Sequence, residues 1–495
     1  MVDWPPSKRY KMSNDDRNSY GGKSILDGIN EAPTSGFHYK TWIISGMGFF
    51  TDAYDLFIIG VVTALLPLAG WATFSTLETS LLVSTALIAA VVGSIIFGRL
   101  LDYLGRKAVY GLEVMLMVIG ALGSAVLTPL NGLYILIIWR FILGIGIGGD
   151  YSASSTIMAE FSNTKKRGKL IGMVFSMQSI GLLAGPLITL GLLYGGVAPV
   201  ISWRLLLAIG AIPPLFVIYW RRHLPETPKY SIRVNGDPKR ASSDLKKFTG
   251  MKFEARPDGA ETGDGSTVKA KWYQLFTDRQ LLTLLIGTAG TWFLMDWALY
   301  GNSIMSSTML AFLVPGSIIG VQHVIMTTAY TALVFGVAAF PGYWLATLLV
   351  DRIGRKPIQI IGFLVMAISF ALLGLLPGLL TASSIVEFLA LYGISYFFIE
   401  FGPNVTTFIY PPEVYPISVR GLGTGISAAG GKTGAFLGTL LNLTIIALFG
   451  ESGLFILLAI FSAVGVMMTF TLLPEPKLRT LEESSAEGRF LKPKT

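Results

Sequence analysis

The segment Gly98–Lys107, with the sequence GRLLDYLGRK, returns in the second half of the chain as TLLVDRIGRK at Thr347–Lys356. In each copy an apolar run ends in the pattern Asp-x-x-Gly-Arg-Lys. One copy alone could be a tight basic turn, but two copies in one chain indicate two related halves. A second pair of strings supports the repeat, because Leu224–Pro228 (LPETP) closes the first half and Leu473–Pro476 (LPEP) closes the second.

The composition places both halves in a membrane. Of the 495 residues, 52% are hydrophobic and only 14% are charged, whereas soluble domains carry about 25% charged residues. A helix that crosses a bilayer needs about 20 mostly apolar residues. We therefore predict an all-α membrane protein with about twelve transmembrane helices in two pseudo-symmetric six-helix bundles. The predicted spans are 41–67, 81–101, 109–128, 133–158, 170–194, 201–220, 281–309, 325–350, 357–377, 384–408, 422–447 and 453–473.

A polar stretch separates the sixth apolar run from the seventh. It contains turn sequences at Arg256–Gly259 and Gly263–Ser266. We interpret the chain as five segments: a cytoplasmic tail at 1–40, an N-terminal bundle at 41–223, a cytoplasmic linker at 224–280, a C-terminal bundle at 281–474 and a cytoplasmic tail at 475–495.

The positive charges fall in alternate loops. The net charge is +8, and Lys and Arg gather at 106–107, 165–169, 221–222, 352–356, 420 and 477–479. The intervening loops carry neither residue type. This bias places both termini and the linker in the cytoplasm of a multi-pass protein of the cell membrane. It indicates a lipid bilayer rather than nucleic acid as the partner of the basic residues.

Acidic residues inside apolar runs are the first candidates for function. Asp150 and Asp296 lie in the fourth and seventh spans, and a charge at that depth is costly unless it is protonated, paired or next to water. Asp52 and Asp55 are three residues apart in the first span, so they lie on one face of a helix. Two close carboxylates disfavour simultaneous ionisation. The alternative is that one of them caps a helix break or forms a structural ion pair.

Further polar residues suggest a binding site. Trp292, Asp296 and Tyr300 form one stripe of the seventh span, and Trp and Tyr offer donors suited to oxyanions. Lys432 lies in the middle of the eleventh span, where a fixed cation attracts anions or forms a permanent ion pair. Gln178 and Asn404 are amides in apolar helices, which can also serve only as interhelical hydrogen bonds.

Charged residues near the repeated loops are candidates for a gate. Glu160 lies about three helical turns from Asp150, close to the basic cluster at 165–169, and we expect it to join a charge network with the loop of Arg106. Asp102 and Arg106, and their counterparts Asp351 and Arg355, complete the predicted gating set. The glycines at 144–149 and at 421–431 predict close approach of helices.

Taken together, these strings resemble the major facilitator superfamily, whose hallmark loop matches Gly98–Lys107. More narrowly the chain resembles the phosphate:proton symporter family. The segments that carry the resemblance are Gly46–Phe57, Gly148–Glu160, Thr291–Tyr300, Phe401–Asn404 and Gly425–Lys432.

The resemblance implies a set of site residues. Those matching the family's phosphate site are Tyr151, Gln178, Trp292, Asp296, Tyr300, Asn404 and Lys432, and those matching its proton-coupling carboxylates are Asp52, Asp55 and Asp150. Three positions depart from the family pattern. Ser152 stands where the family usually has Pro, Thr424 where many members have His, and Glu400 where a neutral residue is usual. Glu400 adds negative charge near the expected anion site.

These features predict a proton-coupled importer of inorganic phosphate that works by alternating access. An anion beside ionised Asp150 and Asp296 would be repelled, so we expect protonation of one carboxylate to favour anion binding, and the reverse. The rivals are a proton-linked sugar or organic-acid carrier of the same fold and a phosphate sensor that does not transport. No metal cluster, nucleophile elbow or cofactor loop is present in the sequence, so we expect neither an enzyme nor a cofactor. The sequence leaves the oligomeric state open.

Overall fold

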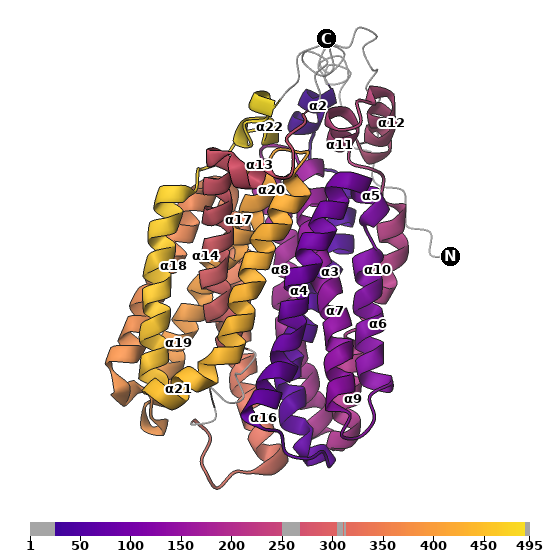
Figure 1. Ribbon diagram of the computed structural model, residues 1–495. Helices are drawn as coiled ribbons and strands as arrows, with labels where there is room; N and C mark the ends of the chain where they lie inside the picture. Colours follow the sequence, from indigo (N-terminus) through magenta and orange to yellow (C-terminus); the bar gives the residue numbers. More distant parts are fainter. Residues whose placement is uncertain (1–24, 250–267, 304–309, 311–312, 491–495) are drawn as a thin grey trace.

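The computed structural model describes residues 25–249, 268–303, 310 and 313–490, and these residues form helices packed side by side (Figure 1). Within them, eleven helices are long and apolar enough to cross a membrane. The last, α21, has 53 residues, about 80 Å of helix, which is more than twice a hydrocarbon core. Its backbone leaves helical geometry at Gly450 (φ 71°, ψ 175°). It therefore holds two spans, which makes twelve.

The first six spans form one bundle and the last six form another. The N-terminal bundle consists of α3 (Gly36–Leu65), α4 (Thr76–Leu104), α5 with α6 (Arg106–Val109, Leu112–Val126), α7 (Leu133–Phe161), α8 (Arg167–Tyr194) and α9 with α10 (Pro199–Ile209, Ile212–His223). The C-terminal bundle consists of α14 (Arg279–Ser303), α16 with η4 and α17 (Gly320–Val334, Phe335–Ala339, Phe340–Ile353), α18 (Arg355–Leu375), α19 with η7 and α20 (Ile385–Ile399, Glu400–Asn404, Val405–Val414) and α21 (Arg420–Leu472). The predicted fold class is confirmed.

Short helices lie in the segments that connect or follow the long helices. They are α2 (Ile25–Glu31), η1 (Pro67–Ala69), α11 (Pro228–Arg233), α12 (Pro238–Thr249), α13 (Gln274–Thr277), η5 (Pro377–Leu379), η6 (Ala382–Ser384), α22 (Leu481–Ser484) and η8 (Glu487–Phe490). We call the end of the bundles that carries α2, α11, α12, α13 and α22 the capped end, at the top of Figure 1. The linker is thus partly helical, while the turn sequences at 256–259 and 263–266 lie outside the described residues.

The span limits differ in detail from the predicted ones. The first and sixth helices extend beyond 41–67 and 201–220 at their ends nearest the capped end. The predicted run 281–309 is described as a helix to Ser303, and 304–309 lie outside the described residues. The predicted break between 447 and 453 falls at Gly450.

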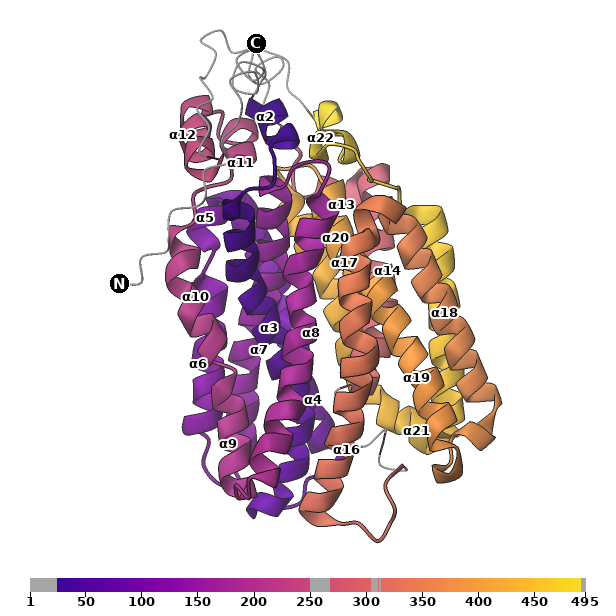
Figure 2. The same ribbon diagram turned by 180° about the vertical axis from the view of Figure 1, so that it is seen from behind.

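The bundles meet along two seams. One joins α4 to α21 (Figure 1), and the other joins α8 to α16 and α17 (Figure 2). The first seam depends on glycine, because a Cβ at Gly98 or Gly425 would collide with the carbonyl oxygen of Gly421 or Ser94 on the opposite helix. A larger side chain at either glycine would push the bundles apart.

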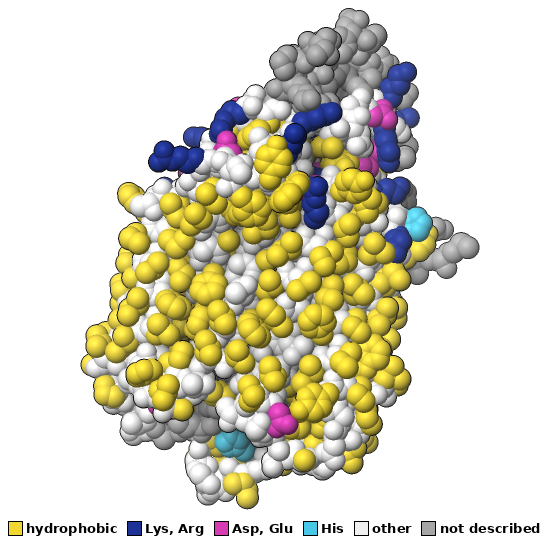
Figure 3. Space-filling view, viewed as in Figure 1, with side chains coloured by type: hydrophobic (Ala, Val, Ile, Leu, Met, Phe, Trp, Pro, Cys, Tyr) yellow, Lys and Arg dark blue, Asp and Glu magenta, His cyan; other side chains and the backbone are white. Residues whose placement is uncertain are grey.

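The outer surface has the composition of a membrane protein. The face shown in Figure 3 is covered by hydrophobic side chains over most of its height, and its visible Lys and Arg gather at the capped end. Large hydrophobic residues such as Ile138, Phe216 and Phe470 are 58–67% exposed. A hydrophobic surface of this extent is unfavourable in water and is typical of a protein surrounded by lipid.

The two repeated strings fold against each other within each half. Gly105 and Gly354 have φ angles of 95° and 111°, which favour glycine, and each turns the chain into the next helix. The carboxylate of Glu226, in the first LPE string, accepts the backbone N–H groups of Arg106 and Lys107. Glu475, in the second string, accepts those of Arg355 and Lys356. The repeat is therefore a helix-capping unit.

Candidate functional site

A buried cation lies between the two bundles. Lys432 projects from the middle of α21, and its Nζ donates to Asp296 Oδ2 and to the Tyr300 hydroxyl, both at 2.9 Å. The ammonium also lies 4.4 Å from the ring centroid of Tyr151, which comes from the N-terminal bundle. None of these side chains is more than 2% exposed. Gly431 permits this arrangement, because a Cβ there would collide with Trp292 on α14.

A chain of hydroxyl and amide groups extends from this cation across α7, α8, α17 and η7. The Tyr300 and Tyr151 hydroxyls lie 3.1 Å apart, and Gln178 Nε2 donates to Tyr151 at 2.6 Å. Gln178 Oε1 accepts from the hydroxyl of Tyr343 at 3.1 Å. Asn404 Nδ2 in turn donates to the Tyr343 hydroxyl at 2.7 Å. The structure thus brings most of the predicted anion-binding residues into one connected group.

The indole of Trp292 also faces this group. Its ring lies 5.8 Å from that of Tyr151. Its N–H lies near Asp296 but makes no well-formed hydrogen bond among the described residues. Oδ1 of Asp296 likewise has no hydrogen-bond partner among the described residues. A buried donor beside an ion pair costs free energy unless something binds it, so this corner of the site has capacity for a ligand atom.

Aromatic side chains close the site on both sides. Following the helix directions, Phe49, Phe175 and Phe408 lie one turn toward the capped end, with the Phe175 and Phe408 rings stacked at 4.4 Å. Toward the other end, Phe57 stacks on Tyr300 at 5.0 Å. The polar group is therefore shut off from water on both sides in this conformation.

The two carboxylates of the first span lie in different surroundings. Asp52 feels the charges of Asp150, Arg221 and Lys432, and neither of its oxygens has a hydrogen-bond partner in the described part of the chain. Asp55 lies against Gly210 and near Arg140, which donates to its backbone carbonyl at 2.7 Å. Both side chains are fully buried. A buried carboxylate without a donor is more stable with its proton than without it.

Asp150 forms an ion pair with an arginine of its own bundle. Arg221, at the end of α10, binds it through two nitrogens, at 2.6 and 3.1 Å, and Ser154 donates to the same carboxylate at 2.5 Å. Arg221 also pairs with Glu113 at 2.9 Å. The structure therefore does not bring Asp150 into contact with Asp296, contrary to the expectation of two carboxylates around one anion. The charges of Asp150 and Lys432 both act on Asp52.

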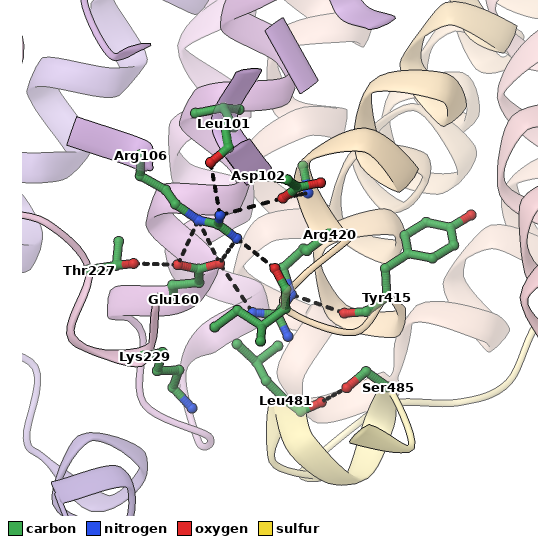
Figure 4. A network of polar contacts seen from close by, with 12 residues as sticks. Leu101, Asp102, Arg106, Glu160, Thr227, Lys229, Tyr415, Arg420, Leu481 and Ser485 are labelled. Carbon is green, nitrogen blue, oxygen red and sulfur yellow. Dashed lines mark hydrogen bonds and ion pairs between the residues drawn. The ribbon is translucent and has the colours of Figure 1, made fainter. Parts of the chain in front are cut away.

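The capped end holds the two bundles together through ion pairs (Figure 4). Glu160 pairs with Arg106 at 2.8 Å within its own bundle and with Arg420 of the other bundle at 3.3 Å. Thr227 donates to the same carboxylate at 2.5 Å. Arg106 also donates to the carbonyl oxygen of Ile417 across the interface at 2.9 Å. The predicted contact between Glu160 and the loop of Arg106 is present.

The second half repeats this arrangement. Glu413 pairs with Arg355 of its own bundle at 2.7 Å and with Arg167 of the other bundle at 2.8 Å. Each half thus supplies one Glu that binds an arginine from each bundle. All four arginines are about 1% exposed or less.

The aspartates of the repeated loops connect the bundles a second time. Asp102 accepts the backbone N–H groups of Gly421 and Leu422, at 2.9 and 2.8 Å, at the first turn of α21. Asp351 accepts those of Gly168 and Lys169, at 3.1 and 2.8 Å, at the first turn of α8. A carboxylate at a helix N-terminus is favourable because the unpaired N–H groups and the helix dipole both attract it. We call these two contacts the aspartate latches.

The last described segment, 477–490, crosses this end of the molecule. Glu482 pairs with Lys229 at 2.8 Å, and Glu487 binds Arg420 at 3.0 Å and the backbone N–H of Ile417 at 3.1 Å. The Lys229 ammonium lowers the pKa of Glu482 to about 2. Burial raises the pKa of Glu226 above its usual value. The segment therefore covers Arg420, which joins the two bundles through Glu160.

Sequence reasoning missed several of these residues, although the repeat contained a signal for some of them. Glu160 and Arg167 are seven residues apart, as are Glu413 and Arg420, and a Gly follows each arginine. Comparison of the two halves could therefore have indicated the ion pairs between bundles, in which the Glu of one half binds the Arg of the other. In the sequence Arg221 reads as part of a basic loop because it neighbours Arg222. The signal for its role was indirect: Glu113 and Asp150 lie in apolar runs and need a cation. Tyr343 had no distinguishing signal.

Comparison with known proteins defines the class. The chain matches the family of sugar (and other) transporters over residues 33–487. It is 34% identical to the probable inorganic phosphate transporter 1-6 of Arabidopsis thaliana, over 94% of this chain and 96% of that one. It is also 34% identical to the repressible high-affinity phosphate permease of Neurospora crassa, over 93% and 88%.

A solved structure of the proton:xylose symporter XylE, bound to 6-bromo-6-deoxy-D-glucose, superposes with a TM-score of 0.77 at 21% identity. It covers 92% of this chain and 99% of that one, and this likeness concerns the fold alone. The protein is a transporter of the major facilitator superfamily and not an enzyme. Within that class it belongs to the family that contains the inorganic phosphate transporters.

Proposed function

We propose that the protein is a symporter that carries inorganic phosphate and protons together into the cell. The observation that carries the proposal is the buried Lys432, surrounded by N–H and O–H donors from both bundles. Phosphate is an anion with several acceptor oxygens, and such donors around a fixed cation match it. The names of the relatives at 34% identity support the same substrate.

The buried ammonium of Lys432 favours an anion over a sugar. A neutral sugar gains little from a buried ammonium that is already paired with Asp296. An anion can compete for Lys432, and it also offers an acceptor to the N–H of Trp292. We propose Tyr151, Gln178, Trp292, Asp296, Tyr300, Asn404 and Lys432 as the phosphate-binding residues.

Protons would enter through the first span. Asp52 has unpaired oxygens and lies within electrostatic reach of Lys432, so its ionisation would oppose anion binding and its protonation would favour it. Reciprocity then makes the bound anion favour the proton. Asp55 and Asp150 remain proposed partners in this coupling, and Asp150 would have to leave Arg221 to accept a proton.

The latches and the ion pairs at the capped end support alternating access. We propose that the capped end faces the cytoplasm, with the linker and both tails there, since the visible Lys and Arg gather at that end. Asp102, Arg106, Glu160, Asp351 and Arg355 would form the inner gate, which is closed in this conformation. Release of phosphate inward would need these contacts to break.

Competition in proteoliposomes tests the substrate. Uptake of radiolabelled phosphate should be inhibited by excess phosphate or arsenate and little affected by sulfate, hexoses or benzoate. Uptake of a hexose or of benzoate, with no effect of phosphate, would instead identify a sugar or organic-acid carrier. Phosphate binding without uptake would identify a sensor.

A further inference from the structure

An additional carboxylate lies in an irregular turn of the tenth span. Glu400 begins η7 (Glu400–Asn404), a widened helical turn in which Gly402 has non-helical φ and ψ (−103°, −110°) and Pro403 lacks an N–H. Widened turns of this kind often mark functional sites. The Glu400 side chain is fully buried.

No cation forms an ion pair with Glu400 among the described residues, a property that it shares with Asp52 and Asp55 of the first span. Its Oε2 accepts from Asn404 Nδ2, and its Oε1 has no hydrogen-bond partner in the described ranges. By contrast Asp296 is paired with Lys432, and Asp150 with Arg221. A buried, ionised carboxylate whose nearby donors, Asn404 and the Tyr343 hydroxyl, are all neutral is unfavourable, so this position favours a protonated acid.

The same residue ends the hydrogen-bonded chain that begins at Lys432. From the ammonium the chain passes through Tyr300, Tyr151, Gln178, Tyr343 and Asn404 to Glu400. The tyrosine hydroxyls and side-chain amides between the two ends carry both donors and acceptors, so the bonds of the chain polarise one another. An anion bound to these groups would therefore lie between a fixed cation and a titratable acid.

The groups packed around Glu400 leave its charge uncompensated. Tyr343 approaches from α17 and Tyr396 from α19, and both are neutral hydroxyls, while Asp296 on α14 adds a second negative charge within electrostatic range. The helices α18 and α20, which also pack on the turn, contribute Gln359 and Thr406, which bind each other at 2.7 Å. With Glu400 ionised, the charges of Lys432, Asp296 and Glu400 sum to one negative charge before any anion enters.

We propose that Glu400 is a proton-binding residue of the anion site, which must hold a proton for phosphate to bind. The proton comes from water, neutralises the carboxylate and leaves an O–H that can donate to a phosphate oxygen. Phosphate affinity then depends on the protonation of Glu400 in addition to that of the first-span carboxylates. This inference rests on the proposed phosphate transport.

The test is the pH dependence of phosphate affinity in the wild-type protein and in Glu400→Gln, which mimics the protonated acid. The matched control is Glu387→Gln, at the exposed start of α19. At acidic pH the two dissociation constants should agree. Above the titration of Glu400, the wild-type value should rise about tenfold per pH unit relative to that of Glu400→Gln, as linkage requires. Titration of phosphate itself cancels in this ratio.

A ratio that does not change with pH, or that Glu387→Gln reproduces, would overturn the inference. If wild-type protein binds no phosphate at any pH, the proposed function itself fails. A second measurement needs no variant. Infrared difference spectra of wild-type protein with carboxyl-labelled glutamate should show a protonated glutamate when phosphate is added at alkaline pH, and absence of that signal would also contradict the inference.

Discussion

Replacing Asp102 by Asn should weaken the closed capped end by at least about 2 kcal/mol. The carboxylate accepts two backbone N–H groups of α21, at 2.9 and 2.8 Å. A hydrogen bond to a charged group contributes about 1.5–3 kcal/mol and a neutral one about 0.5–1.5 kcal/mol. Asn has a single acceptor oxygen, so one of the two bonds becomes neutral and the other is lost, and the change costs at least about 2 kcal/mol. Two kcal/mol lowers the ratio of closed to open molecules about 30-fold. Asp351→Asn, in the other latch, should act in the same direction.

The assay is a distance measurement between spin labels at Tyr103→Cys and Ile353→Cys, at exposed ends of α4 and α17. The chain contains no cysteine, so these two labels give no background. Asp102→Asn should add a population with a longer distance. The control is Asp237→Asn, because Asp237 accepts the backbone N–H of Arg240 within the linker and does not join the bundles. A distance distribution identical to that control would refute the reasoning.

Three further predictions follow from the buried charges. Lys432→Met should abolish phosphate binding and lower the free energy of unfolding by about 3–5 kcal/mol, because it leaves Asp296 buried without its cation. Phosphate-binding assays and thermal unfolding measure these two effects, with Thr433→Val as the control. Phosphate binding retained in Lys432→Met would contradict the proposed site. Asp52→Asn should keep phosphate exchange but lose accumulation driven by a pH gradient in proteoliposomes, and undiminished accumulation would remove Asp52 from the coupling. The contact of Glu482 with Lys229 should persist from pH 5 to 8. Because the pKa of Glu482 is lowered from 4.5 to about 2 in the folded protein, the stabilisation from this contact is complete above pH 4.5 and is lost only as the pH falls toward 2. Hydrogen exchange in 477–490, corrected for its intrinsic pH dependence, measures this contact, and loss of protection between pH 8 and 5 would contradict it.

The fold could be predicted because it depends on simple patterns. Length and hydropathy mark the spans, and the repeated Asp-x-x-Gly-Arg-Lys and Leu-Pro-Glu strings mark the two halves. The repeat also has a local physical cause, since Gly105 and Gly354 need positive φ and Glu226 and Glu475 cap the helices that follow. Such local requirements are visible in a sequence.

The partners of the buried charges could not be predicted in the same way. Asp150 was expected beside the anion site, but a helix residue gives no indication of which neighbouring helix supplies its counter-ion. Arg221 reaches it because α10 continues to His223, one turn farther than hydropathy suggests. The aromatic stripe of Trp292 and Tyr300 was found because its spacing follows one helix, whereas Tyr343 joins the site only through tertiary packing.

The central claim is that proton and phosphate binding favour each other in a buried site around Lys432. The most direct test is uptake of radiolabelled phosphate by purified protein in proteoliposomes with an imposed pH gradient, acid outside. Phosphate should accumulate above its external concentration, and a protonophore should abolish the accumulation. Uptake that only equilibrates phosphate, with the same rate and extent with and without the gradient, would contradict the claim.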